Sequence, residues 1–296
     1  MSEDAPRGAH RAGVVALLGP PNAGKSTLLN RLLGQKLAIV TAKPQTTRSR
    51  ILGIYTCPGA QILLLDTPGL HQSPKALNAV LNEAVEEAAR DCDLALLLVD
   101  TTRGWQPAHA ALAAGLEERR TPFLAVGTKG DLPAAGRWPP SEAHAAAGAA
   151  RISAQTGDGV DALLRDVIER LPEAPAYYGE DELTDRPVRW LAAELVREAF
   201  FEELGQELPY VMAVDVVRFD ESRAGLVDIR ANLLVQRNSQ KRIVIGRGGE
   251  MIKRIGIRAR AEIERLVGCQ VHLELWVKIE PRWLKNPRRM ESLGYG

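Results

Sequence analysis

A glycine-rich run near the start of the chain has the residue types of a phosphate-binding loop. Residues 19–26 read Gly-Pro-Pro-Asn-Ala-Gly-Lys-Ser, which fits the pattern G-x-x-x-x-G-K-[ST]. Glycines let successive backbone N–H groups converge on phosphate oxygens, and the start of the following helix adds further donors. A lysine supplies positive charge to the β- and γ-phosphates, and a serine hydroxyl can bind Mg²⁺. The run therefore predicts a nucleotide site centred on Lys25 and Ser26.

Three further short motifs follow apolar runs: Asp66-Thr67-Pro68-Gly69, Thr128-Lys129-Gly130-Asp131 and Ser153-Ala154-Gln155. Ligands of open α/β sheets bind at the carboxyl ends of the strands, so all three should meet the phosphate loop at one edge. Asp66 would hold Mg²⁺ through water, and the Gly69 N–H would meet the γ-phosphate. The Asp131 carboxylate can accept two hydrogen bonds from guanine that adenine cannot offer, and the Ala154 N–H could donate to guanine O6. One such motif alone is better explained by a surface turn, but together they predict GTP.

A second distinctive run, residues 244–256, reads Val-Ile-Gly-Arg-Gly-Gly-Glu-Met-Ile-Lys-Arg-Ile-Gly. Gly246 and Gly249 leave no Cβ in the path of a sugar-phosphate chain, Arg247 can pair with phosphate, and a helix N-terminus favours anions. Three isoleucines are expected to form an apolar floor under the bases: Ile245, Ile252 and Ile255. Residues 241–265 carry eight basic residues against three acidic ones. That balance is typical of either a polyanion-binding surface or a solvated helix face.

The elements that position the first group of motifs alternate between apolar runs and helical stretches over residues 11–171. The runs are Val14–Leu18, Ile62–Leu65, Leu94–Val99, Phe123–Val126 and a weak one ending at Ile152. Continuous apolar runs of this kind predict βαβ units and a parallel sheet that is covered on both faces. A helix is expected over Ser26–Leu33. Another is expected over the alanine-rich Ala143–Ala150, because alanine has the highest helix propensity.

The chain changes character after residue 172. A segment rich in proline and acidic residues predicts an interdomain linker, and a helix is expected over Val188–Leu204. Strands are expected over Val211–Phe219, Leu226–Val235 and Val271–Ile279. Between the last two lie a short apolar run, Ile243–Ile245, and a basic helix that ends near Val267. The predicted order is α-β-β-α-α-β.

Length and composition agree with a two-domain globular protein. The chain has 296 residues, of which 45% are hydrophobic and 25% charged. Its apolar runs are far shorter than the roughly 18 residues that cross a bilayer, and its N-terminus does not read as a signal peptide. Cys57, Cys92 and Cys269 lie far apart without a metal-binding spacing, so they are expected to be reduced thiols in a cytosolic protein. The net charge of +1 indicates no partner by itself.

With these motifs in order, the chain resembles the Ras-like translation-factor GTPases and, within them, the Era family. The resemblance to the Era family rests on three motifs: Pro21–Ser26, Gln45-Thr46-Thr47-Arg48 as switch I, and Asp66-Thr67-Pro68-Gly69-Leu70-His71. Residues 244–256 resemble the KH signature V-I-G-x-x-G-x-x-I-K-x-I-G. The resemblance covers residues 14–279. It implies an α/β P-loop GTPase domain with a mostly parallel sheet, followed by an α+β type II KH domain.

The domain boundaries that follow are a disordered tail over 1–10, a GTPase domain over 11–172, a linker over 173–186, a KH domain over 187–281 and a basic tail over 282–296. Nucleotide contacts are expected from Gly19, Asn22, Ala23, Gly24, Lys25, Ser26, Thr27, Asp66, Gly69, Thr128, Lys129, Asp131, Ser153, Ala154 and Gln155. Mg²⁺ ligands are expected to be Ser26, Thr47 and Asp66, and the catalytic groups Lys25, Thr47 and Gly69. RNA contacts are expected from Ile245, Gly246, Arg247, Gly248, Gly249 and Lys253.

The resemblance implies a slow GTPase switch that binds the single-stranded 3′ end of 16S rRNA and acts in assembly of the small (30S) ribosomal subunit. It also implies a monomer in the cytoplasm. For the tail that contains Trp283, three alternatives stay open: an extension of the RNA surface, contact with anionic lipid at the inner membrane face, or a solvated tail that packs one tryptophan.

The sequence departs from the family's guanine motif at Thr128, and it differs from Ras-type enzymes at Leu70. Thr128 stands where the guanine motif has asparagine, and a hydroxyl can replace only part of that side chain's bonding. Leu70 stands where Ras-type enzymes have the glutamine that orients water, so a slow unaided rate is expected. Related GTPases use a potassium ion held partly by the residue equivalent to Asn22, whose alternative role is to brace the loop.

Two rival functions remain from sequence alone. One is a non-enzymatic RNA-binding protein that keeps its GTPase domain as a scaffold, for which Thr128 and Leu70 are the only support. The other is a GTPase of tRNA modification, which lacks a C-terminal KH domain.

Overall fold

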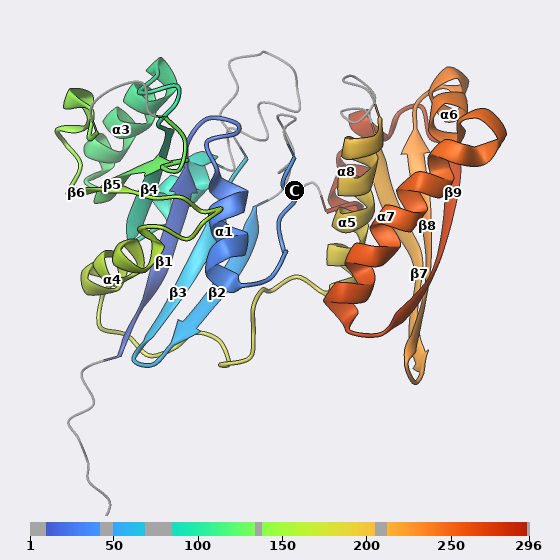
Figure 1. Cartoon of the computed structure of the whole chain (residues 1–296), viewed down its shortest axis with the longest axis horizontal. Coiled ribbons are helices and arrows are strands. Elements are labelled where there is room, and N and C mark those ends of the chain that lie inside the picture. The colour runs from blue at the N-terminus through green and yellow to red at the C-terminus, as the bar shows by residue number, and fades with distance from the viewer. Residues whose placement is uncertain (1–9, 42–49, 69–84, 134–137, 205–211, 295–296) are drawn as a thin grey trace, which may run out of the picture. The chain divides into compact units, whose positions relative to one another are not determined.

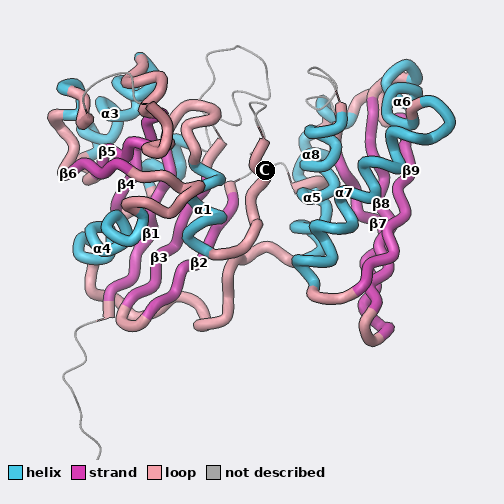
Figure 2. Tube along the Cα trace, in the orientation of Figure 1, coloured by secondary structure: helices cyan, strands magenta, loops and turns pink. Residues whose placement is uncertain are grey.

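The structure is a computed structural model that describes residues 10–41, 50–68, 85–133, 138–204 and 212–294. The chain divides into two compact units, residues 1–38 with 47–185 and residues 39–46 with 186–296. Figures 1 and 2 show their elements. The predicted fold class, an α/β domain with a mostly parallel sheet followed by an α+β domain, is confirmed.

The first unit contains a six-stranded sheet with the order β2-β3-β1-β4-β5-β6. Its strands are β1 (Arg11–Leu18), β2 (Ile51–Cys57), β3 (Ala60–Asp66), β4 (Leu94–Asp100), β5 (Phe123–Thr128) and β6 (Gly148–Arg151). Its helices include α1 (Lys25–Leu33), α3 (Pro107–Arg119) and α4 (Val160–Arg170). Residues of β3, β4 and β5 are buried throughout, which explains why these strands read as unbroken apolar runs.

Strand β2 was not among the predicted strands, and it is antiparallel to β3. A Pro58-Gly59 turn joins the two strands, with Cys57 opposite Ala60. Gly59 has φ +81°, which favours glycine. The mixture of apolar and polar residues in Ile51–Cys57 reflects its edge position, where only part of the strand is buried.

The expected helix over Ala143–Ala150 is wrong. Only Ser141–Ala143 form a short 3₁₀ turn, and Gly148–Arg151 form the edge strand β6. The N–H of Ala147 donates to the carbonyl of Phe123, and β6 then pairs in parallel with β5. Pairing with an existing sheet outweighs the weak intrinsic preference of alanine for helix.

The predicted linker lies along the first unit through specific hydrogen bonds. The side chain of Gln61 is fully buried; its carbonyl oxygen accepts from Tyr177 N and Tyr178 N, and its amide donates to Tyr178 O. Farther along, the N–H of Ile54 donates to Leu183 O, at 2.9 Å. A segment without periodicity is therefore fixed by backbone bonding to β2 and β3.

The second unit has the predicted order. Its elements are α5 (Val188–Glu203), β7 (Ala213–Arg223), β8 (Leu226–Val235), α6 (Asn238–Ile245), α7 (Glu250–Val267) and β9 (Gln270–Ile279). The sheet order is β7-β8-β9, with β7 and β8 antiparallel and β8 and β9 parallel. The apolar run Ile243–Ile245 forms the last turn of α6.

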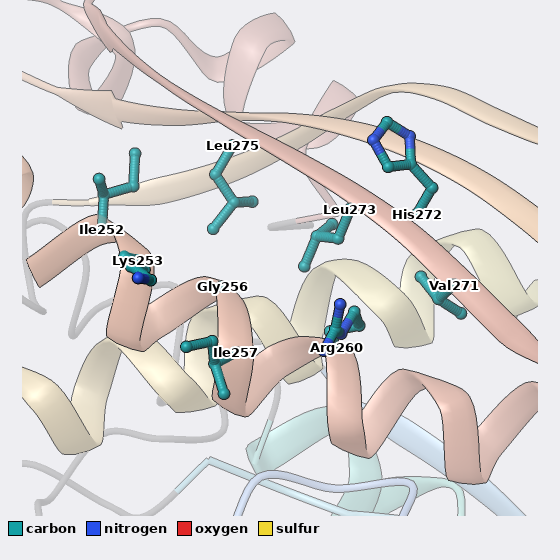
Figure 3. A pocket seen from close by; sticks show the side chains of 9 residues that line it. All are labelled: Ile252, Lys253, Gly256, Ile257, Arg260, Val271, His272, Leu273 and Leu275. Atoms are coloured by element: carbon teal, nitrogen blue, oxygen red, sulfur yellow. The ribbon is translucent and has the colours of Figure 1, made fainter. Parts of the chain in front are cut away.

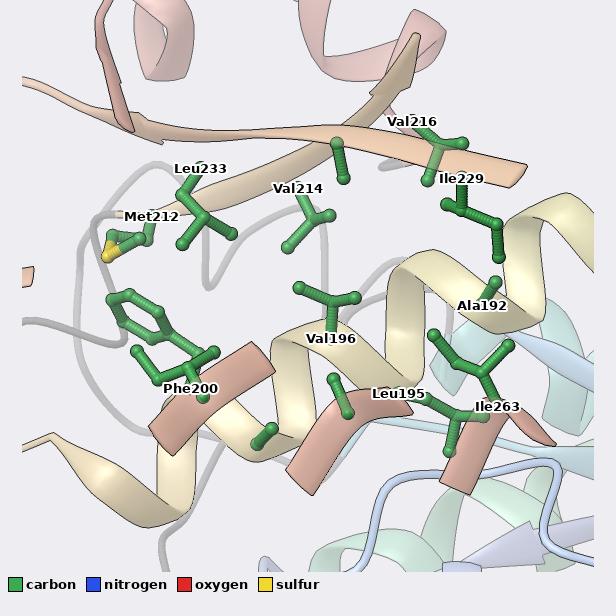
Figure 4. Packing of buried hydrophobic residues seen from close by; sticks show 14 of the residues in the cluster. Ala192, Leu195, Val196, Phe200, Met212, Val214, Val216, Ile229, Leu233 and Ile263 are labelled. Atoms are coloured by element: carbon green, nitrogen blue, oxygen red, sulfur yellow. The ribbon is translucent and has the colours of Figure 1, made fainter. Parts of the chain in front are cut away.

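One hydrophobic core joins α5 and α7 to one face of this sheet (Figure 4). Val196 and Phe200 from α5 and Ile263 from α7 are buried against Ile229 and Leu233 of β8. The packing places the two helices on the same side of the sheet and leaves β9 as an edge strand beside α7.

The C-terminal segment covers part of the opposite face. Trp283 is 1% exposed and packs with Ala213 and Leu234, which alternate with core-facing neighbours on their strands. In the helix that follows, α8 (Pro287–Ser292), Arg289 forms ion pairs with Asp215 and Glu280. This arrangement matches the third alternative for the tail, in which the tryptophan packs. In the part of the chain that is described, no helix has the length and apolarity needed to span a membrane.

Candidate functional site

The phosphate loop joins β1 to α1 in a conformation that its residue types permit. Gly19 and Gly24 have φ values of +148° and +94°, and Asn22 has +63°. A Cβ on Gly19 would lie 2.7 Å from the carbonyl oxygen of Leu98. The loop is thus pressed against the end of β4, and the N-terminus of α1 begins directly at Lys25.

Lys25 is buried within its own loop. Its Nζ donates to the carbonyl oxygens of Gly19 and Pro20 at 2.9 and 3.0 Å, and the residue is 6% exposed. Burial lowers the pKa of Lys25 from 10.5 to about 8, although the negative charge of Asp66 opposes this. Phosphate oxygens would replace the two carbonyl acceptors and stabilise the charged form.

The two predicted Mg²⁺ ligands that are described lie side by side. Ser26 Oγ donates to Asp66 Oδ2 at 2.7 Å, although the residues are 40 positions apart. Asp66 is fully buried at the end of β3, and Thr67 Oγ1 donates to Leu17 O, which fixes that end of the strand to β1. A hydroxyl and a carboxylate oxygen form a hard donor set that fits Mg²⁺.

The residues expected around guanine are brought together by the ends of β5 and β6. The N–H of Gly130 donates to Ile152 O at 2.8 Å, and the N–H of Ile152 donates to Gly127 O at 2.7 Å. These bonds place the loop that starts at Thr128 beside the loop that starts at Ser153. The Asp131 side chain is exposed and so is accessible to a ligand.

Thr128 provides a direct link between the guanine loop and the phosphate loop. The residue is 2% exposed, and its Oγ1 donates to Ala23 O at 2.8 Å, with Val99 O at 3.3 Å. The hydroxyl therefore braces the phosphate loop. This is the part of the family asparagine's bonding that a threonine can supply. Among the predicted residues, Thr47, Gly69 and Leu70 lie outside the described part of the chain, so their expected roles stay predictions.

The GxxG loop of the second unit requires its glycines. Gly246, Gly248 and Gly249 have φ values of +75°, +60° and +83°. A Cβ on Gly246 would lie 2.6 Å from the Cβ of Met251, whereas Cβ atoms on the other two would face open space. Gly246 is thus fixed by close packing as well as by its conformation. The loop leads into the N-terminus of α7 at Glu250.

Beside this loop, a groove of about 340 Å³ runs between α7 and the edge strand β9 (Figure 3). Its lining combines apolar and basic side chains: Ile252, Lys253, Gly256, Ile257, Arg260, Val271, His272, Leu273 and Leu275. Lys253, Ile257 and Arg260 recur at helical spacing on one face of α7. An apolar floor with cations on its rim suits stacked bases and a sugar-phosphate backbone.

Four of the basic residues of α7 fall into two groups that the sequence did not separate. Arg254 and Arg258 form ion pairs with Glu203 on α5, the second also with Glu202. Lys253 and Arg260 instead line the groove, and Arg260 Nε lies 3.9 Å from Glu264 Oε1. The basic stripe thus divides between two faces of one helix, one that lines the groove and one that pairs with α5.

Ile255, expected under the bases, is fully buried in the core with Ala259 and Ile263. The i, i+4, i+8 spacing of these three places them on the helix face turned away from the groove. Groove residues such as Ile257 and Leu273 were not predicted from the sequence. They come together only because α7 packs beside β9. Ile252 lies in the groove, as expected.

Comparisons with known proteins agree with this division. The sequence model of the 50S ribosome-binding GTPase family matches residues 14–129. The model of the KH domain family matches residues 207–284.

Full-length relatives combine both parts. The GTPase Era of Stenotrophomonas maltophilia is 43% identical over 302 residues, with all of both chains covered. The GTPase Era of Geobacter metallireducens is 43% identical over 297 residues, covering 96% of this chain and 98% of the relative. A crystal structure of Era with MgGDPNP and nucleotides 1506–1542 of 16S ribosomal RNA superposes with a TM-score of 0.88 at 35% identity, covering 97% of this chain and 99% of that one. A crystal structure of a single-residue variant of Aquifex aeolicus Era bound to GDP·AlF4⁻ gives the same values.

Proposed function

The chain belongs to the GTPase Era family, and from that premise we propose that it is a GTP-hydrolysing switch whose KH groove binds the 3′ end of 16S rRNA during assembly of the small ribosomal subunit. Its relatives match it over the full length. The observation that carries the proposal is that one chain contains both a glycine-rich loop whose Ser26 Oγ lies 2.7 Å from Asp66 Oδ2 and a groove beside a GxxG loop. A GTPase of tRNA modification does not explain the second feature.

We propose that Lys25, Ser26, Asp66 and the loop N–H groups hold the phosphates and Mg²⁺. The metal supplies charge neutralisation at the β- and γ-phosphates when bound. The oxygens of Ser26 and the buried Asp66 are already 2.7 Å apart, so little rearrangement is needed to receive it. Thr47 and Gly69 are proposed to complete the γ-phosphate contacts, with Asp131 and Ala154 at the guanine.

The intact site argues against the scaffold alternative. A protein that had lost nucleotide binding would have no reason to keep a lysine with a burial-lowered pKa beside a buried carboxylate, because both groups are costly without a ligand. Thr128 keeps its bond to the phosphate loop. Leu70 accounts for a slow unaided rate and gives no support to loss of function.

We also propose that a monovalent cation partly replaces the missing glutamine, with Asn22 as one ligand. Asn22 has φ +63°, which turns this loop residue into a conformation that asparagine tolerates better than most residues. GTP hydrolysis measured in equal concentrations of K⁺ and Na⁺ should be several-fold faster in K⁺. Equal rates would remove the cation and leave loop bracing as the role of Asn22.

The proposed location is the cytoplasm, with the protein acting as a monomer. We further propose that the C-terminal segment could contact anionic lipid. It would have to use exposed basic residues such as Arg282 and Arg288, because the one tryptophan of that segment is buried.

The proposed function is tested by binding a fluorescent RNA with the sequence of the 16S rRNA 3′ end to the full-length protein. The titration is run with GDP and with a non-hydrolysable GTP analogue, and GTP turnover is measured beside it. Preferential binding of this RNA over a scrambled one, with measurable turnover, supports the proposal. Equal binding of both RNAs would overturn the ribosomal target. If no GTP turnover were measured, the GTPase domain would be a scaffold and not an enzyme.

A further inference from the structure

The residues that follow β4 support the loop expected to hold guanine. Strands β4 and β5 are parallel neighbours, with Asp100 directly opposite Thr128 in the register. The chain leaves both strands at the same edge of the sheet. Asp100 and Thr101 therefore contact Lys129 at the start of that loop, although neither residue belongs to a nucleotide motif.

The Asp100 carboxylate uses its two oxygens for different purposes. Oδ1 accepts from the N–H and hydroxyl of Thr102 at 2.9 and 2.6 Å, which closes the turn after β4. Oδ2 accepts from Lys129 Nζ at 2.5 Å. The exposed Arg103 is a weaker neighbour, with Nε 3.9 Å from Oδ2. The Asp100 side chain is 7% exposed and that of Lys129 36%, so the pair is only partly screened by water.

Lys129 needs such an anchor because of its backbone. It has φ +58°, a left-handed conformation that residues with a side chain disfavour. Thr101 is buried, and its Oγ1 and N–H both donate to Thr128 O, at 2.9 and 3.2 Å, on the preceding peptide group. Burial alone would raise the pKa of Asp100, but the bonds from Lys129 and Thr102 outweigh it and lower the pKa, so the carboxylate is charged at neutral pH.

We propose that Asp100 is a positioning residue for guanine recognition. Through Oδ2 it fixes Lys129 and so the left-handed turn that places Asp131, two residues later. This inference rests on the proposed placement of guanine at Asp131 and adds a residue outside the family's nucleotide motifs. The guanine loop, in which Thr128 replaces asparagine, is then held both by the Thr128 hydroxyl and by Asp100.

The test compares the affinities of the full-length protein for GDP and IDP, because IDP lacks the 2-amino group that the Asp131 carboxylate should accept from. Asp100→Asn keeps an oxygen for Thr102 but places an amide opposite Lys129 Nζ. We expect it to weaken GDP binding about fivefold, as for a partly screened ion pair whose remaining charge is left uncompensated, and to narrow the preference for GDP over IDP. Thr102→Val is the matched control, which removes an Oδ1 bond and should leave that preference unchanged.

A double-mutant cycle shows whether the effect passes through Lys129. Asp100→Asn should cause little further loss in a Lys129→Met background. An unchanged GDP/IDP ratio in Asp100→Asn, or full additivity with Lys129→Met, would overturn the positioning role. Partial unfolding cannot imitate it, because unfolding lowers both affinities equally and leaves their ratio unchanged. Asp131→Asn tests the premise separately: if that variant keeps the GDP/IDP ratio of the wild type, the placement of guanine is wrong, and the role of Asp100 falls with it.

Discussion

The two ligand sites of this protein bind phosphate in physically different ways. The nucleotide site uses buried groups that hydrogen bonds fix before any ligand arrives, as Lys25 and Asp66 illustrate. The groove proposed to bind RNA has exposed cations above an apolar floor, as Lys253 and Arg260 illustrate. A small ligand of constant shape can repay the cost of burying charge. A flexible polymer is better held by groups that stay in water and adapt to it.

The largest expected effect concerns the base and lies wholly in the nucleotide site. Asp131→Asn replaces a carboxylate that accepts two guanine hydrogen bonds with an amide. GDP affinity should fall by more than about a hundredfold, since each bond to a charged group contributes about 1.5–3 kcal/mol. Binding of XDP, whose 2-oxo group can accept from the amide, should rise. Titration of both nucleotides measures the exchange; unchanged GDP affinity would contradict the placement of guanine.

The next effect should be confined to the RNA site. The double change Arg247→Asp and Gly248→Asp puts two carboxylates where phosphates approach. The fold should tolerate the second change, because a Cβ on Gly248 meets open space and aspartate accepts its φ of +60° better than most residues. RNA affinity should fall well over about tenfold, while GDP affinity stays the same. Equal loss of both would indicate unfolding, and unchanged RNA affinity would refute the role of the loop.

A third prediction separates the two faces of α7. Lys253→Gln with Arg260→Gln should weaken RNA binding about tenfold and flatten its dependence on salt, because two phosphate contacts and their released counterions are lost. Arg254→Gln with Arg258→Gln changes the net charge equally but removes ion pairs with α5 and leaves the groove lining unchanged. Filter binding at several salt concentrations compares the two variants. Equal losses would mean that overall charge, and not the groove, determines affinity.

The smallest expected effect is a pH dependence found at the nucleotide site alone. The folded, nucleotide-free protein has Lys25 with its pKa lowered to about 8. Above that pH the free site loses its charge, and phosphate binding must take up a proton. GDP affinity should therefore be flat below the pKa and fall about fourfold between pH 7 and 8.5. RNA binding and the binding of guanosine, which lacks phosphates, serve as controls; a flat GDP profile would contradict the burial of a titrating lysine.

The residues by themselves predicted both ligand classes, because phosphate loops and GxxG loops depend on local conformations that few residue types allow. Gly19, Gly24 and Gly246, which belong to the two predicted loops, have positive φ values in the structure. Strands buried on both faces were also predicted, because such strands consist of unbroken runs of apolar residues. Strand β2 was not predicted, and the alanine-rich segment was wrongly predicted as a helix, because the conformation of both depends on which strand they pair with.

Other features depended on tertiary structure alone, because they join residues that are distant along the chain. Only packing shows that Thr128 braces the phosphate loop at Ala23 and that Asp100 holds Lys129. Packing also decides which basic residues of α7 face the groove and which are neutralised by α5. Charge and periodicity are properties of one segment, whereas a site is formed by the surfaces that two segments turn toward each other. The sequence therefore determined the chemistry of this protein, and the fold decided which side chains are placed to perform it.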